Sequence, residues 1–270
     1  MARRVASVNN KGGVGKTTTT VRLAEGLAKA GKRVLVVDMD PQGNASQMLG
    51  WDYNPAEKQP TISQAIKAAE DHEGTARDVI QPIGWTCDYA ERIALAPARL
   101  TLENRMSEAA EPGAWQRLDA ALKGVDDSFD YTLIDCPPSL WHLTQLGLVA
   151  AQDAVIVTEA DIYSIDAAKR TRDFIKNKGP KLGNPELTLR GVVINAFDEQ
   201  TVRQGEQRDS VRRIFGDLVW DPIVKFREGL ATGNNNAVSL AEAHRVTRIS
   251  EIRATYELLT QTFLKEIPLP

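Results

Sequence analysis

The segment Lys11-Gly-Gly-Val-Gly-Lys16-Thr-Thr18 limits the possible folds more than any other part of this chain. It follows a short β-type run, Val5–Val8, and leads into a helical pattern that extends from Lys16 to Ala30. A strand, a Gly-rich turn and a helix that opens with Gly-Lys-Thr form a phosphate-binding loop. The backbone N–H groups of such a turn and the positive end of the helix both favour a polyphosphate anion. In this loop Lys16 reaches the β- and γ-phosphates, and the Thr17 hydroxyl ligates Mg²⁺.

The order of elements predicts an α/β fold with a mostly parallel, twisted β-sheet flanked by helices on both faces. Gly31 ends the first helix, and an apolar strand over 33–38 follows within about 35 residues of the first strand, which makes a βαβ unit. Three further apolar runs, at 131–135, 154–158 and 189–195, continue the sheet. The middle of the chain is less regular. We expect a helix over 100–122 with a break at 111–113, and a short strand over 218–220.

Acidic and amide residues stand at the ends of three of these strands. Asp38 and Asp40 follow the second strand, and Asp135 ends the strand over 131–135. Ligands of α/β sheets lie at the carboxyl ends of the strands, where carboxylates can hold the water shell of Mg²⁺ or orient an attacking water. Asn195 ends its strand on the same side, and it either hydrogen-bonds a base or caps a turn.

Charge is unevenly distributed along a chain whose formal net charge is −3. Residues 51–130 carry 15 acidic and 8 basic side chains, whereas 165–190 carry 7 basic and 3 acidic, and 201–248 carry 8 basic and 6 acidic. The later segments therefore form either a local positive surface or ordinary solvated helix faces. No apolar run approaches the roughly 20 residues of a membrane span. With Cys87 and Cys136 outside any metal-type spacing, we expect a cytoplasmic protein.

Three motifs together resemble the ParA/Soj partition ATPases, which belong with MinD to the deviant Walker-A superfamily of P-loop NTPases. They are Lys11-Gly-Gly-Val-Gly-Lys16-Thr-Thr, Val37-Asp-Met-Asp40-Pro-Gln-Gly-Asn44 and Ile134-Asp135-Cys-Pro-Pro-Ser139. The similarity extends through nearly the whole chain and fades over 45–90 and after 229. It implies one ParA-like ATPase domain over 1–270, and the early first strand predicts no N-terminal helix-turn-helix extension.

The resemblance also implies roles for individual residues in an ATP-bound sandwich dimer that uses Mg²⁺. Lys16 matches the phosphate-loop lysine, and Lys11 matches a signature lysine that crosses to the ATP of the partner subunit. Asp40 matches the residue that positions the hydrolytic water, and it belongs with Asp135, acting through water, and Asp38, acting as support, to the metal site. The nucleotide contacts implied are Lys11, Gly12, Gly13, Val14, Gly15, Lys16, Thr17, Thr18 and Asn195.

The output implied by the resemblance is DNA partition. The ATP-bound homodimer of such proteins binds DNA without sequence preference on the nucleoid, and a ParB-type partner stimulates their slow hydrolysis of ATP. Candidate DNA contacts in this chain are Arg212, Arg213, Lys225 and Arg227. A MinD-like membrane positioner would need a basic amphipathic C-terminal helix, which residues 249–270, with a net charge of −1, do not provide. An electron-transfer ATPase like the nitrogenase iron protein would need paired cysteines that bridge the dimer. Cys136 directly follows Asp135 and Cys87 lies in an irregular segment, so their spacing does not favour this alternative. A positioner of protein cargo would carry the same ATPase motifs, and this alternative stays open.

Overall fold

One seven-stranded sheet organises the computed structural model, which describes residues 1–57, 59–199, 201–226, 237–243 and 247–269. The strand order is β3-β4-β2-β5-β1-β6-β7, and every neighbouring pair is parallel except β3 with β4. The mostly parallel α/β sheet predicted from the sequence is therefore confirmed. The strands are β1 (Arg3–Val8), β2 (Val34–Asp38), β3 (Gln81–Pro82), β4 (Ile93–Ala96), β5 (Tyr131–Asp135), β6 (Asp153–Glu159) and β7 (Thr188–Asn195).

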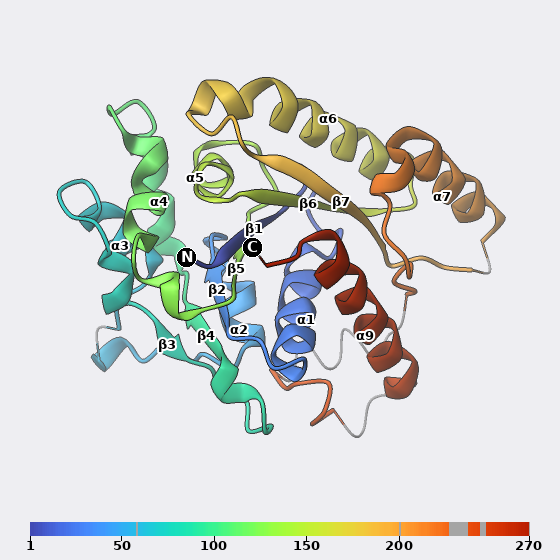
Figure 1. Ribbon diagram of the computed structural model, residues 1–270, viewed down its shortest axis with the longest axis horizontal. Helices are drawn as coiled ribbons and strands as arrows, with labels where there is room; N and C mark the ends of the chain where they lie inside the picture. The colour runs from blue at the N-terminus through green and yellow to red at the C-terminus, as the bar shows by residue number, and fades with distance from the viewer. Residues whose placement is uncertain (58, 200, 227–236, 244–246, 270) are drawn as a thin grey trace.

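Helices cover both faces of this sheet (Figure 1). On one face the buried side chains of the strands pack with those of α3 to α7, and on the other they pack with α1, α2 and α9. This division explains why the central strands are apolar at nearly every position, since both of their faces are covered. The helices are α1 (Lys16–Lys29), α2 (Asn44–Met48), α3 (Ile62–Ala68), α4 (Arg117–Leu122), α5 (His142–Ala150), α6 (Ile162–Lys178), α7 (Val202–Phe215) and α9 (Ile249–Glu266). None of the helices in the described part of the chain is long and apolar enough to cross a membrane.

The sheet register brings the acidic strand ends together. Asp135 at the end of β5 pairs with Ser7 of β1 on one side and with Asp38 of β2 on the other. The loop that follows β1 therefore emerges beside both carboxylates. Parallel strands place their carboxyl ends at one edge, so residues that are about 100 positions apart in the sequence become neighbours there.

Two expectations about secondary structure were wrong in detail. The segment expected as a helix with a break forms a 3₁₀ stretch over Leu100–Glu108, and only Arg117–Leu122 is α-helical. The expected strand over 218–220 is reduced to a single bridge between Val219 and Val192. Gly216–Leu218 is instead a 3₁₀ turn. A run of three apolar residues is too short for periodicity to distinguish a strand from a turn.

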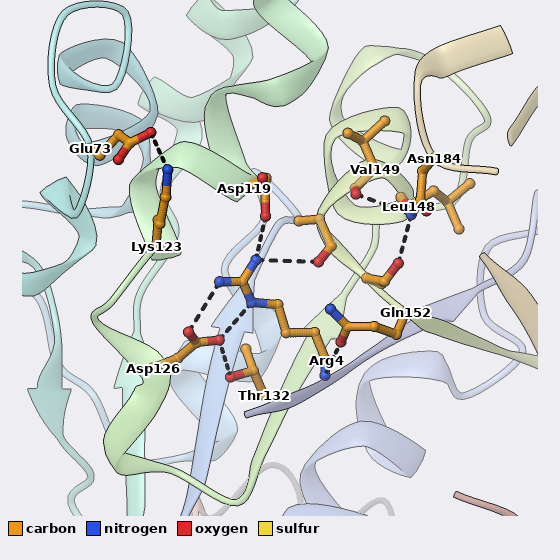
Figure 2. Close-up of polar contacts among 12 residues, drawn as sticks. Arg4, Glu73, Asp119, Lys123, Asp126, Thr132, Leu148, Val149, Gln152 and Asn184 are labelled. Atoms are coloured by element: carbon orange, nitrogen blue, oxygen red, sulfur yellow. Dashed lines mark hydrogen bonds and ion pairs between the residues drawn. The ribbon is translucent and has the colours of Figure 1, made fainter. Parts of the chain in front are cut away.

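A buried arginine, Arg4 of β1, lies at the amino-terminal ends of the central strands, away from the acidic strand ends (Figure 2). Its guanidinium forms two hydrogen bonds with the fully buried carboxylate of Asp126, Nε to Oδ2 at 2.6 Å and Nη2 to Oδ1 at 3.0 Å. Nη1 reaches Asp119 at 2.6 Å, and the Thr132 hydroxyl donates to Asp126 at 3.0 Å. This network joins β1 to β5 and to the segment that precedes β5, so it fixes the base of the central strands.

Candidate nucleotide site

The loop between β1 and α1 has the backbone of an anion-binding turn. Gly13 and Gly15 have φ of 77° and 85°, in the left-handed region that glycine adopts without strain, and Gly15 caps the N-terminus of α1. A Cβ atom on Gly15 would lie 1.8 Å from the amide nitrogen of Asn195. Glycine is therefore required at this position for two reasons, its conformation and its contact with the end of β7.

A cavity of about 740 Å³ opens over this loop at the carboxyl ends of the strands. Its volume lies within the range of small-molecule and cofactor sites. The structure thus brings six predicted loop residues and Asp40 around one space, while Lys11, Val14, Asp38, Asp135 and Asn195 lie outside its lining. The lining residues are Gly12, Gly13, Gly15, Lys16, Thr17, Thr18, Asp40, Gln42, Asn44, Gln47, Met48, Pro138 and Ala237.

Lys16 supplies a buried positive charge to this cavity. Its side chain is almost fully buried, and Nζ donates a hydrogen bond to the backbone carbonyl of Lys11 at 3.1 Å. Burial lowers the pKa of Lys16, while the charges of Asp135 and Asp40 oppose that shift. An anion bound in the cavity would restore the lysine pKa, because an opposite charge favours the ammonium form. The site therefore favours a phosphate ligand electrostatically.

Asp38 and Asp40 are linked through the backbone of the loop that follows β2. The Asp38 carboxylate accepts hydrogen bonds from the Asp40 amide at 3.1 Å and from the Ser46 amide and hydroxyl at 2.9 and 2.7 Å. Asp40 itself lines the cavity, and its Oδ1 accepts from the Gln42 amide at 3.0 Å. Asp38 thus shapes the loop, and Asp40 lies in the wall of the cavity.

Asp135 has an unused buried acceptor. Its Oδ1 accepts from the Thr20 hydroxyl at 3.2 Å, but Oδ2 has no hydrogen-bond partner among the described residues. Burial, together with the charge of Asp38, raises the pKa of Asp135 to about 7. A hydrogen bond from the Thr17 side chain opposes this rise in pKa, so Thr17 and Asp135 lie together. The pair fits a hydrated Mg²⁺ that would be held by the Thr17 hydroxyl and, through water, by Asp135. Among the described residues no group of three or more acidic, His or Cys side chains could hold a metal ion.

The raised pKa of Asp135 leads to a prediction about stability. The folded state holds the Asp135 proton more tightly than the unfolded state, whose pKa is near 3.8, so stability is lost as pH rises between these values. Replacing Asp135 with Asn removes this loss. We expect the variant to gain stability over wild type, by at most about 1.4 kcal/mol per pH unit, between pH 4 and 7 and to keep a constant advantage above pH 7. Thermal unfolding in EDTA at several pH values measures it. The exposed Asp71→Asn variant is the control, and an advantage that does not change with pH would contradict the assignment.

Lys11 points away from the cavity of its own chain. Its ammonium contacts Asp161 Oδ2 at 3.0 Å and Ser164 Oγ at 2.8 Å, and it lies 3.7 Å from Glu159 Oε2. Although burial alone would raise it, the pKa of Asp161 is lowered by hydrogen bonds from Ser164 and Lys11. The second lysine of the loop is therefore held at the start of α6, where it is one-third exposed.

Sequence reasoning missed part of the lining. Gln42 lies in the turn after Asp40, Asn44 begins α2, and Pro138 lies three residues after Asp135. All three belong to motifs quoted from the sequence, but no role was predicted for them. Ala237 comes from a segment about 220 residues after the loop, and no local pattern indicates its place. Thr20, which donates to Asp135, reads in the sequence as one of four consecutive threonines.

The predicted DNA contacts lie on and after α7, and two of them are engaged within the chain. Arg212 pairs with Asp221 at 2.7 Å, and Lys225 pairs with Glu199 at 2.6 Å. Arg213 is exposed and has no ion pair within the described ranges. Arg227 lies outside the described residues.

Comparison with known proteins agrees with this geometry. A family model described as an AAA domain matches residues 2–188. The chromosome-partitioning ATPase Soj of Thermus thermophilus is 32% identical over 256 residues, which cover 92% of this chain and 94% of that protein. Two solved structures are also similar. The apo form of Cyanothece McdA has a TM-score of 0.83 at 23% identity, covering 97% of this chain and all of that one, and shows the same fold.

The second similar structure contains a nucleotide. Cobyrinic acid a,c-diamide synthase from Mycobacterium smegmatis, solved with bound ADP and magnesium, has a TM-score of 0.78 at 26% identity, and the match covers 100% of this chain and 99% of that one.

The phosphate-binding loop, the acidic strand ends and the extent of the match to Soj lead to one assignment. The chain belongs to the ParA/Soj family of chromosome-partitioning ATPases.

Proposed function

We propose that this chain is an ATP-dependent DNA partition ATPase whose ATP-bound homodimer binds DNA without sequence preference in the cytoplasm, on the nucleoid. The observation that carries the proposal is the arrangement of the two loop lysines. Lys16 lies in the cavity, whereas Lys11 is held 3.0 Å from Asp161 at the same edge of the sheet but outside the cavity. A single chain therefore offers one lysine to its ligand and keeps a second lysine near its surface.

ATP and Mg²⁺ are the ligands that the cavity suits. The N–H groups of Gly13 to Thr18 and the Lys16 ammonium would hold the phosphates, and Thr17 with Asp135 would hold the metal ion, which supplies charge neutralisation at the phosphates. Asp40, which lines the same cavity, would orient the attacking water. Supporting this, the similar synthase from M. smegmatis was solved with ADP and magnesium bound.

Dimerisation would give Lys11 its function. Three large apolar side chains are exposed near this edge, Trp141 (72% exposed) after β5, and Ile162 and Tyr163 (47% and 76%) after β6. A second copy placed face to face would cover them, and the Lys11 of each subunit could then approach the γ-phosphate of the other. The added cation would stabilise charge that develops during hydrolysis only after assembly, so hydrolysis would depend on the dimer.

The DNA surface that we propose extends beyond the predicted arginines. The Arg172 guanidinium of α6 contacts the Ile214 carbonyl at 3.4 Å and lies over the Phe215 ring, so α6 packs against the end of α7. Five exposed cations stand on these two helices and the turn after α6, without an ion pair in the described chain. They are Arg170, Lys176, Lys178, Lys181 and Arg213. Unpaired cations can neutralise DNA phosphates without first breaking an internal ion pair.

Co-sedimentation with DNA tests the function, with ATP, ADP or no nucleotide at two salt concentrations. We expect retention with ATP only and its loss at the higher salt, because phosphate contacts release counterions. Lys11→Ala should bind ATP but neither dimerise nor sediment. The triple variant Lys176→Gln/Lys178→Gln/Lys181→Gln should make the negative slope of log affinity against log salt shallower by about 1 to 3. Lys67→Gln/Lys123→Gln, on exposed pairs elsewhere, is the matched control.

Two results would reject the partition function. DNA binding that is the same with ATP, ADP or no nucleotide would contradict control of DNA binding by ATP. A preference for anionic liposomes over DNA would favour a membrane positioner. Stimulation of ATP hydrolysis by a ParB-type protein together with DNA, measured as phosphate release, tests the proposed partner. A chain that binds ATP but not DNA would also contradict the partition function.

A further inference from the structure

Two buried asparagines form hydrogen bonds with the phosphate-binding loop, one at each of its ends. Asn9, only 1% exposed, lies at the start of the loop; its Nδ2 donates to the Val157 carbonyl of β6 at 2.7 Å. Its Oδ1 accepts the backbone N–H of Lys11 at 3.0 Å. One side chain therefore ties the first turn of the loop to the neighbouring strand.

Asn195 holds the other end. It is 6% exposed, and its Nδ2 donates to the Val14 carbonyl at 3.0 Å. A carbonyl only accepts hydrogen bonds, so the nitrogen of the amide must face the loop. The same amide lies against Gly15 so closely that no Cβ would fit between them. The end of β7 is thus in direct contact with the last two residues before α1.

These contacts set the direction of the donors that a phosphate needs. The Val14 carbonyl and the Gly15 N–H belong to one planar trans peptide and point in opposite directions. A carbonyl held toward Asn195 therefore turns the Gly15 N–H away from β7, and Gly15 lines the cavity. At the other end, the Lys11 N–H donates to Asn9, which limits the number of orientations that the loop can adopt.

We propose that Asn9 and Asn195 are positioning residues that keep the loop in its phosphate-binding conformation before the ligand arrives. Their contribution acts on the phosphates and is independent of the base. Preorganised donors cost no ordering when the anion binds, so this contribution appears as affinity. The inference rests on the proposed binding of ATP, and it gives Asn195 a role that differs from the base contact that its place at a strand end predicts.

Binding of magnesium tripolyphosphate and of ATP, measured by competition against a fluorescent ATP analogue, separates these roles. We expect Asn195→Ala and Asn9→Ala each to weaken both ligands by the same factor, about 5- to 15-fold, the size of one or two lost hydrogen bonds. Asn195→Asp should weaken both further, since a carboxylate cannot donate to Val14 and adds a negative charge near the phosphates. The ratio of the two affinities should stay at the wild-type value in all three variants.

Asn184 provides the matched control. Its amide donates to three backbone carbonyls, those of Leu148, Val149 and Ala151, at 2.7 to 3.1 Å (Figure 2). This contact lies at the end of α5, away from the loop. Asn184→Ala should lower the melting temperature at least as much as Asn195→Ala but leave both affinities unchanged. A loss of both affinities in this control would show that general destabilisation explains the effect, and the proposal would then be wrong.

Two other results for the asparagine variants would also overturn the proposal. A loss confined to ATP in Asn195→Ala would establish a base contact, and unchanged affinities would show that the amides do not organise the loop. Either result overturns the inference. It is also contradicted if the wild-type chain binds ATP but not tripolyphosphate, since the braced loop would then not hold the phosphates. A wild-type chain that binds neither ligand refutes the proposed function itself.

Discussion

Replacing Asp40 with alanine is expected to lower the rate of ATP hydrolysis by about 100-fold or more while ATP affinity stays within about 3-fold of wild type. Asp40 lines the cavity beside the loop, and a carboxylate that orients or deprotonates the attacking water contributes roughly 10²- to 10⁴-fold. The contacts to the phosphates come from the loop residues and Lys16, which the substitution leaves in place. Phosphate release and equilibrium binding of a fluorescent ATP analogue measure the two quantities.

Asp40→Asn distinguishes the carboxylate from its place in the loop. The amide keeps an oxygen for the 3.0 Å contact with the Gln42 N–H but carries no charge. We expect it to be nearly as slow as Asp40→Ala and, like it, to accumulate as an ATP-bound dimer in light scattering. The exposed Asp71→Ala variant should hydrolyse ATP at the wild-type rate. Normal hydrolysis by Asp40→Asn would assign Asp40 a purely structural role.

The second large effect is expected on stability, in Arg4→Ala, at the amino-terminal ends of the central strands. Asp126 is fully buried, and this substitution removes the guanidinium that forms two hydrogen bonds with it. An uncompensated buried charge costs about 3 to 5 kcal/mol, which is a large part of the stability of an ordinary domain. Urea unfolding monitored by circular dichroism gives the free energy of unfolding for the variant and for wild type.

Two further variants interpret that loss. Arg4→Met/Asp126→Leu removes both charges, and it should recover most of the stability, because apolar replacement of a buried pair is often neutral. Lys123→Ala breaks an exposed pair with Glu73 near the same network (Figure 2) and should cost less than about 1 kcal/mol. An Arg4→Ala variant as stable as wild type would contradict a contribution of the Arg4–Asp126 pair to stability.

Prediction from the sequence succeeded where chemistry depends on residues that are adjacent in the chain. The glycines of the phosphate-binding loop and the Lys16-Thr17 pair lie within eight residues, and their spacing is enough to predict both the turn and its ligand. The carboxylates at strand ends required one further rule, that parallel strands share a ligand edge, and the register of Asp38 with Asp135 follows it. The irregular segment 100–122 had no such constraint, and its helix was misjudged.

Contacts between distant segments could not be read in the same way. Lys11 pairs with Asp161, 150 residues away, and Asn195 reaches Val14 across 181 residues. The sequence shows that each of these side chains is polar and stands near a strand end, but that pattern leaves the partner open. Asn195 was predicted to hydrogen-bond a base or to cap a turn, and only the packed sheet shows its contact with the loop, because it brings the end of β7 against Gly15.

The sequence by itself thus determined the α/β class, the phosphate-binding loop and the residue types that surround its ligand, because these depend on short spacings and on strand polarity. The tertiary structure decided where the second lysine rests, which amides brace the loop, and that Arg4 and Asp126 are buried together. Those outcomes depend on strand order and register, which the whole chain sets when it buries its apolar faces. Lys11 and Lys16 belong to one short motif, yet only the folded chain places them in different surroundings.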